Sequence, residues 1–291
     1  MSAGSRRYSV VVLICAFAAG TFFAPTQLNL AHAESSAEVA NLLEVSSVQE
    51  SLDCLSDELI ETVRNEGSLN RALAECRQEL QASIEAAFGA TNEDTLRAIL
   101  ATIVAANFAE YGSSTAIEYS AIASEAFLNC GNTVILVGHL FGLRDERLRT
   151  VGFDGGSIGN HAQLLYSDPA GDFLLDPTVG IIAKIGFDDL LRGVRIPRSA
   201  IKIYPIKART IETFRLTVLE ALTHGSYKPS DFMYMHETVA EHISKGGLEN
   251  YFTPAGIYLR RAKSMANTEQ DRMQRRNAIG SSRANAGRTR Q

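Results

Sequence analysis

Three residues that can perform acyl transfer follow one another along the chain: Cys130, His161 and Asp176. Cys130 stands directly before an apolar run, "GNTVILVGHLFGL", whose spacing predicts a helix that begins at the cysteine. The start of a helix favours a negative charge, because its first backbone N–H groups are unpaired and the helix dipole is positive there. A thiol at this position is a candidate nucleophile, provided that a base lies beside it.

Among the histidines, His161 has the predicted setting that suits this base. His139 lies nine residues into the predicted helix, which places it on the opposite side and roughly 13 Å from the cysteine. His224, His236 and His242 fall in a predicted helical part, where we expect surface or capping roles. His161 instead opens a predicted strand, "NHAQLLYS".

A predicted hairpin brings Asp176 to His161. The strand "NHAQLLYS" is joined by the turn signal "DPAGD" to a second strand, "FLLDPT". If Tyr166 pairs with Phe173 across this turn, the register of the hairpin is fixed. Gln163 then faces Asp176, and His161 becomes the diagonal neighbour of Asp176 on the same face of the sheet. A register shifted by one residue would place Asp176 on the other face, so the sequence leaves that alternative open.

Each of the three residues has a role in one mechanism. Cys130 would attack a carbonyl carbon, His161 would accept its proton and later protonate the leaving group, and Asp176 would orient the imidazole. The backbone N–H of Cys130 is one candidate donor to the oxyanion, and the sequence does not reveal a second. The alternatives are a buried structural thiol, an ordinary sheet histidine and a turn aspartate.

The ordered set resembles the transglutaminase-like superfamily of papain-fold cysteine enzymes, as an exported bacterial member. The resemblance rests on Cys130, His161 and Asp176 in this order and on the segments "LFGLRDERLRTVGF", "GNHAQLLY" and "FLLDPTVG", within roughly residues 115 to 180. It implies an α+β fold in which a helix carrying the cysteine packs on a small antiparallel sheet carrying the histidine and the aspartate. It also implies a cysteine peptidase or amidase that acts on a peptide or protein substrate.

The chain departs from the family pattern at several positions. Leu128 stands where the family usually has glycine, and Gln163 stands where it usually has an aromatic residue. The chain contains no tryptophan, whereas animal crosslinking transglutaminases stabilise the oxyanion with an indole. The missing indole favours hydrolysis. A crosslinking transglutaminase and a catalytically weak binding module of the same fold remain the alternative functions.

The first 33 residues predict an export signal. Arg6 and Arg7 precede an apolar stretch, and the segment ends in the small-x-small pattern "AHA", which predicts cleavage after Ala33. An uncleaved anchor is the alternative, but the apolar stretch is shorter than the roughly 20 residues that span a bilayer. We therefore expect a periplasmic or secreted protein with no membrane span in the mature chain.

Composition divides the remaining chain into three parts. Residues 34–111 are rich in Ala, Leu and Glu and predict helices, and residues 112–259 contain the candidate catalytic core with C-terminal helices. The tail, 260–291, has nine basic and two acidic residues, although the whole chain has a net charge of −5. We expect this tail to be disordered and able to contact anionic surfaces. The acidic body argues against nucleic-acid binding.

Cysteine usage predicts one disulfide in the mature chain. Removal of the leader leaves Cys54, Cys76 and Cys130, an odd number that indicates one bridge and one free thiol. The segment around the first two has helical periodicity broken at 65–67, which predicts a helical hairpin with these cysteines at similar height on its two helices. That bridge would leave Cys130 free. The alternative is three reduced, buried cysteines.

The C-terminal part predicts alternating elements and no cofactor site. We expect a short helix at "FDDLLRG", a strand at "AIKIYPI", a helix at "TIETFRLTVLEALTHG" and another helical segment at "DFMYMHETVAEHISKG". In "HETVAEH", His236 and His242 are six residues apart, whereas two zinc ligands on a helix need a spacing of four. The glycines of "GFDGGSIGN" lack a following lysine and predict turns. We expect no metal and no cofactor.

Overall fold

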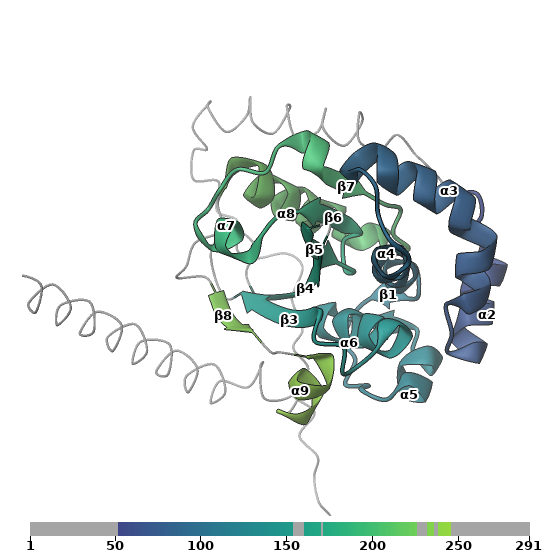
Figure 1. The fold of residues 1–291 in the computed structure, drawn as a ribbon. Coiled ribbons are helices and arrows are strands. Elements are labelled where there is room, and N and C mark those ends of the chain that lie inside the picture. The colour runs from purple at the N-terminus through teal and green to yellow at the C-terminus, as the bar shows by residue number, and fades with distance from the viewer. Residues whose placement is uncertain (1–51, 154–159, 170, 226–231, 236–237, 246–291) are drawn as a thin grey trace, which may run out of the picture. The chain divides into compact units, whose positions relative to one another are not determined.

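The computed structural model describes residues 52–153, 160–169, 171–225, 232–235 and 238–245 (Figure 1). Its α-helices are α2 (Asp57–Glu66), α3 (Asn70–Phe88), α4 (Glu93–Ala106), α5 (Tyr119–Ser124), α6 (Cys130–Phe141), α7 (Phe187–Leu191), α8 (Glu212–His224) and α9 (Val239–Ser244). Its 3-10 turns are η1 (Arg198–Ala200) and η2 (Arg209–Ile211). Its strands are β1 (Glu110–Tyr111), β2 (Phe127–Leu128), β3 (Leu148–Phe153), β4 (His161–Asp168), β5 (Gly171–Asp176), β6 (Ile181–Lys184), β7 (Ile201–Ile203) and β8 (Phe232–Met235). The predicted leader (1–33) and basic tail (260–291) lie outside the described residues.

The predicted helical hairpin is formed by α2 and α3. Ser56 caps α2 by accepting a hydrogen bond from a backbone N–H of the first turn, and Gly67 ends this helix with a φ of +65°, a region that favours glycine. Cys54 and Cys76 form the predicted disulfide, with their Cα atoms 5.1 Å apart. Cys54 lies in a turn before α2, so its predicted position on a helix is wrong. The helix begins only after Ser56 supplies the cap.

Six strands form one antiparallel sheet in the order β7-β6-β5-β4-β3-β8. Strands β4 and β5 form the predicted hairpin, and β3 pairs with β4 on its other side. β1 and β2 form a separate parallel pair just before α6. The described chain is therefore α+β, as predicted.

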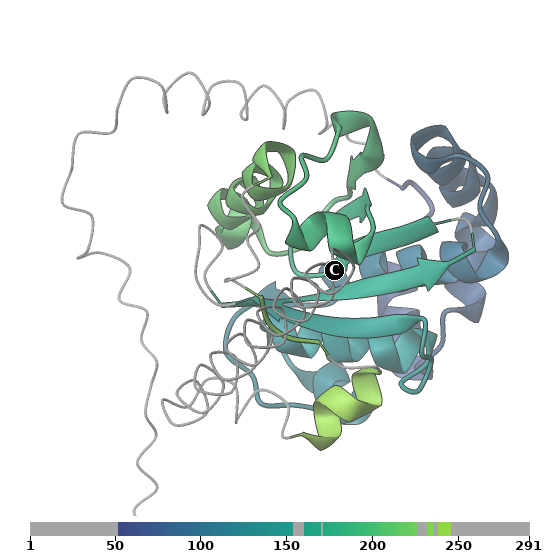
Figure 2. The same ribbon diagram turned by 60° about the vertical axis from the view of Figure 1, so that its left-hand side comes forward.

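The sheet has helices on both faces (Figures 1 and 2). One core joins α3, α4 and α6 to Leu164 and Tyr166 of β4. The other core joins α8 to Leu165 of β4 and Leu174 of β5. Consecutive residues of β4 enter opposite cores because side chains alternate along a strand. Residues from both the predicted helical part, 34–111, and the predicted catalytic core, 112–259, pack in the first of these cores.

The C-terminal part departs from its prediction at one element. The expected short helix, strand and long helix are present as α7, β7 and α8. "FMYM" forms strand β8, where we expected a helix, because the free edge of β3 offers hydrogen bonds to an aromatic segment. A helix follows only from Val239, where Thr238 caps α9. Within the described part of the chain, no helix has both the length and the apolarity needed to cross a bilayer.

Candidate active site

The β4–β5 hairpin brings His161 and Asp176 together. Tyr166 pairs with Phe173, which is the predicted register. Nε2 of His161 lies 2.7 Å from Oδ2 of Asp176, and both side chains are buried. The alternative register, shifted by one residue, is therefore wrong, and the predicted diagonal contact is confirmed.

Hydrogen bonds surround the carboxylate of Asp176. Oδ2 accepts a hydrogen bond from Nε2 of Gln163 at 2.7 Å, in addition to its contact with His161. Oδ1 accepts from the backbone N–H groups of Thr178 at 3.1 Å and Val179 at 3.3 Å. Burial of an unpaired carboxylate is costly, whereas these donors replace the water that it loses. The network also fixes the direction in which the carboxylate meets the imidazole.

Cys130 is the first residue of α6, as predicted, and is the free cysteine of the described chain. Oδ1 of Asn129 accepts hydrogen bonds from the backbone N–H groups of Gly131 and Asn132, at 3.0 and 3.1 Å. Oδ1 of Asn132 accepts a hydrogen bond from the backbone N–H of Asn129, which completes a reciprocal capping box. The two asparagine amides also donate to the carbonyl groups of Ser114 and Ala116. These bonds fix the position of Cys130.

The second ring nitrogen of His161 is available to Cys130. Nδ1 is buried and makes no hydrogen bond of good geometry with any described residue. Burial opposes the charged imidazole, but the Asp176 carboxylate and the Cys130 thiol outweigh this cost and raise the pKa of His161 to about 10. The imidazole is therefore protonated at neutral pH, between the carboxylate and the sulfur.

A pair of threonines joins α6 to the segment after β5. Oγ1 of Thr133 donates to the carbonyl group of Cys130 at 3.0 Å and lies 3.1 Å from Oγ1 of Thr178. Thr178 also donates its backbone N–H to Asp176. This chain of contacts connects the helix that carries the thiol to the strand that carries the carboxylate.

Two residues of α8 complete the surroundings and were not identified from the sequence. The ring of Phe214 meets the ring of His161 edge to face, with centroids 4.9 Å apart. Arg215 is 7% exposed; burial lowers its pKa, while Glu212 and Asp176 act in the opposite direction. A buried cation thus lies within the field of the Asp176 carboxylate. Helical periodicity predicts α8, but it does not indicate that α8 packs beside β4.

The other histidines do not join the site. His139 bonds a backbone carbonyl group before α5 at 2.8 Å, and His224 lies 3.7 Å from Glu220 on the surface. His242 is fully buried, so its predicted surface or capping role is wrong. Its helix, α9, packs against α6 through Val239. His236 lies outside the described residues.

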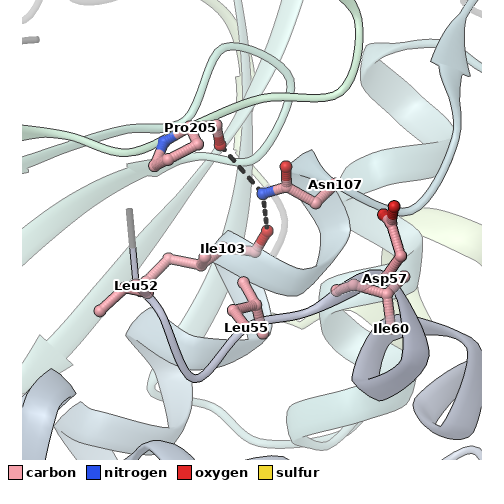
Figure 3. A pocket seen from close by; sticks show the side chains of 7 residues that line it. All are labelled: Leu52, Leu55, Asp57, Ile60, Ile103, Asn107 and Pro205. Carbon is pink, nitrogen blue, oxygen red and sulfur yellow. Dashed lines mark hydrogen bonds between the residues drawn. The ribbon is translucent and has the colours of Figure 1, made fainter. Parts of the chain in front are cut away.

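A cavity of about 160 Å³ is lined by a different set of residues (Figure 3). Its one amide side chain, Asn107, donates to the carbonyl groups of Ile103 and Pro205, both at 2.9 Å. No member of the Cys130, His161 and Asp176 set lines it. The lining residues are Leu52, Leu55, Asp57, Ile60, Ile103, Asn107 and Pro205.

Comparison with models of protein families, with curated proteins and with solved structures finds no match. The functional interpretation therefore depends on the geometry of this chain. A thiol at a helix start, an imidazole and an orienting carboxylate form a set that can perform nucleophilic acyl transfer. Among the described residues, no group of three or more His, Cys, Asp and Glu side chains could hold a metal ion.

Proposed function

We propose that the protein is an exported cysteine-dependent acyl-transfer enzyme that hydrolyses peptide or amide bonds. Cys130 is the nucleophile, His161 the acid–base and Asp176 the orienting carboxylate. The observation that carries the proposal is the position of His161, whose Nε2 meets Asp176 at 2.7 Å while its pKa responds to the Cys130 thiol. A histidine with a purely structural role would not need both a carboxylate and a thiol as partners.

The arrangement of the thiol, the imidazole and the carboxylate supports a defined reaction sequence. The thiolate of Cys130 adds to the carbonyl carbon of the substrate, and the electrons of the C=O bond move to oxygen. Collapse of this intermediate breaks the C–N bond, and the imidazolium of His161 gives its proton to the departing amine. Water then attacks the thioester while His161 accepts one of its protons; the C–S bond breaks, the acid leaves, and the thiolate of Cys130 and the imidazolium of His161 are restored.

A transglutaminase-like core is the fold that we propose for this site. The support is the order of the parts: α6 starts with the cysteine, and the adjacent β4–β5 hairpin supplies the histidine and the aspartate. Gln163 occupies the position at which the resemblance expects an aromatic ring, and here its amide bonds Asp176. Gln163, which departs from the family pattern, thus helps to fix the position of the Asp176 carboxylate.

The activity can be tested on a mixed peptide library. Wild-type protein and Cys130→Ala are incubated with the library, and new N-termini are identified by mass spectrometry. We expect cleavage by the wild type and none by the variant. Peptides that remain intact in both samples, with a fully reduced Cys130, would contradict a peptidase.

The same incubation separates the alternative reactions. A primary amine with a fluorescent label is added together with a glutamine-containing peptide. Incorporation of the amine without new N-termini would indicate a crosslinking transglutaminase, while neither product would favour a binding module. Hydrolysis is favoured here because the chain lacks the tryptophan of the crosslinking enzymes.

A further inference from the structure

The short parallel sheet before α6 places a tyrosine beside Cys130. In the pairing of β1 with β2, Tyr111 stands opposite Leu128, so their side chains lie on the same face. Asn129 continues the extended backbone, with a φ of −103° and a ψ of 179°. Side chains alternate along an extended chain, so Cys130 returns to the face of Leu128 and Tyr111.

Two hydrogen-bond donors near the sulfur are unused within the described chain. Asn129 accepts the N–H groups of the two residues that follow Cys130, which leaves the N–H of Cys130 itself without a partner there. The hydroxyl of Tyr111 also makes no hydrogen bond with a described residue. The Tyr111 residue is 39% exposed, compared with 4% for Cys130.

We infer that Tyr111 is a further catalytic residue, whose hydroxyl stabilises the oxyanion together with the backbone N–H of Cys130. The inference rests on the proposed function, because an oxyanion forms only if Cys130 attacks a carbonyl group. It supplies the second donor that the sequence did not reveal. Donors that are fixed in place before the charge develops are among the largest contributors to catalysis.

The electrostatics of the phenol agree with this position. Burial, followed by the charges of Cys130 and Asp176, raises the pKa of Tyr111. Both charges therefore act on the phenol oxygen, which lies near the reacting thiol. The hydroxyl keeps its proton across the pH range in which an imidazolium–thiolate pair exists, and it can act as a donor throughout.

The role of the phenol belongs to one step of the reaction. When Sγ of Cys130 bonds to the carbonyl carbon, the electron pair of the C=O bond moves to oxygen. The O–H of Tyr111 and the N–H of Cys130 donate to that oxygen and keep their protons. When the electron pair returns, the C–N bond breaks and the amine leaves with the proton of His161.

Two reactions of the same thiol separate this role from other effects of Tyr111. Alkylation by iodoacetamide needs the thiolate but forms no oxyanion. Acylation by 4-nitrophenyl acetate needs the thiolate and passes through a tetrahedral oxyanion. Tyr111→Phe keeps the ring and removes the hydroxyl. We expect acylation to slow by about 10²-fold, the effect of removing one oxyanion donor, while alkylation keeps its rate. Tyr119→Phe is the matched control, because the Tyr119 hydroxyl donates to a backbone carbonyl group of α2.

Each outcome gives a decision. Selective loss of acylation in Tyr111→Phe, with the rate unchanged in Tyr119→Phe, supports the inference. Equal acylation rates in Tyr111→Phe and the wild type overturn the inference. A parallel loss of acylation and alkylation also overturns it, because the phenol would then act on the formation of the thiolate and not on the oxyanion. In either case the proposed function still stands if the wild type forms an acyl-enzyme. A wild type that is neither acylated nor alkylated faster than a free thiol overturns both proposals.

Discussion

At the residue scale, the candidate site is a buried set of ionisable side chains: Cys130, His161, Asp176 and Arg215. Nε2 of His161 lies 2.7 Å from Oδ2 of Asp176. Asp176 also acts on the pKa of Arg215, and Cys130 acts on the pKa of His161. Buried charges are costly when they stand alone, and removal of one partner leaves the other uncompensated. The charge of His161 should therefore contribute to the stability of the fold.

The first prediction concerns the pH dependence of stability. Folding raises the pKa of His161 from 6.5 to about 10, so its bound proton stabilises the native state. This contribution is complete below the unfolded pKa and is lost as the pH rises from about 6.5 through about 10. The test uses Cys130→Ser, because a thiol that loses its proton in the native state would offset the proton that His161 holds. In this variant we expect the free energy of unfolding in urea to fall as the pH rises above about 6.5, and to fall less when His161→Gln is added. A difference between these two variants that stays constant with pH would contradict the assigned charge of His161.

The sequence predicts the three central residues of the site and only part of their surroundings. The contact between His161 and Asp176 could be predicted because the short turn between β4 and β5 fixes which residues of the two strands pair. Tyr111, Phe214 and Arg215 could not be found in this way. They lie on β1 and α8. The local sequence of these segments does not indicate which strand or helix they pack against.

At the element scale, close contacts fix the helices around α6. Gly138 of α6 lies beneath Val239 of α9, and a Cβ atom at Gly138 would lie 2.6 Å from a methyl carbon of that valine. The backbone N–H of Ala240 also donates to the carbonyl group of Leu143, just after α6. The contact therefore requires glycine for space.

The second prediction tests this contact. Gly138→Ala should destabilise the protein by about 1–3 kcal/mol in urea unfolding, because the added methyl group overlaps Val239. The double variant Gly138→Ala, Val239→Ala removes the overlap and should recover part of that loss. A single variant as stable as the wild type would show that α9 does not sit on α6 as described.

The third prediction concerns the disulfide between α3 and the turn before α2. Replacement of both Cys54 and Cys76 by serine should lower the free energy of unfolding by about 2–4 kcal/mol, because the unfolded chain regains the freedom of a 22-residue separation. The alkylation rate of Cys130 should stay unchanged, since neither cysteine of the bridge belongs to the set of Cys130, His161 and Asp176. A changed rate would mean that the helical hairpin controls the site.

The elements differ in how well the sequence predicts them. The helices α3, α4, α6 and α8 have the composition and periodicity that predict them. Strand β8 was predicted as a helix because "DFMYMHETVAEH" has no turn signal to separate its two halves. Pairing with the edge of β3 decides its structure, and that contact comes from residues about 80 positions earlier in the chain.

At the scale of the whole molecule, the N-terminal helices belong to the body that carries the site. Leu80 of α3 and Leu100 of α4 are fully buried in the same core as Val134 of α6 and Leu164 of β4. Removal of these helices would expose that core. Helices α3 and α4 therefore serve as structural parts of the candidate enzyme and would not be released as a pro-segment.

The fourth prediction concerns export. We expect the mature protein to begin at Glu34 and to be recovered from the periplasm or the medium with Cys54 and Cys76 oxidised, since structural disulfides persist in oxidising compartments. Terminal sequencing and thiol counting test this, with Ala33→Lys as a variant that should not be cleaved. A chain found in the cytosol with its first 33 residues intact and both cysteines reduced would contradict export.

The fifth prediction tests the central claim most directly. The rate at which iodoacetamide alkylates Cys130 is measured against pH for the wild type and for His161→Ala. A free thiol with the ordinary pKa of about 8.5 is only about 0.3% ionised at pH 6, so an unassisted thiol reacts slowly there. We predict that the wild type reacts at pH 6 nearly as fast as at pH 8, and that His161→Ala loses about 10²-fold at pH 6. A wild type that follows the profile of a free thiol, with no change in the variant, would contradict the account.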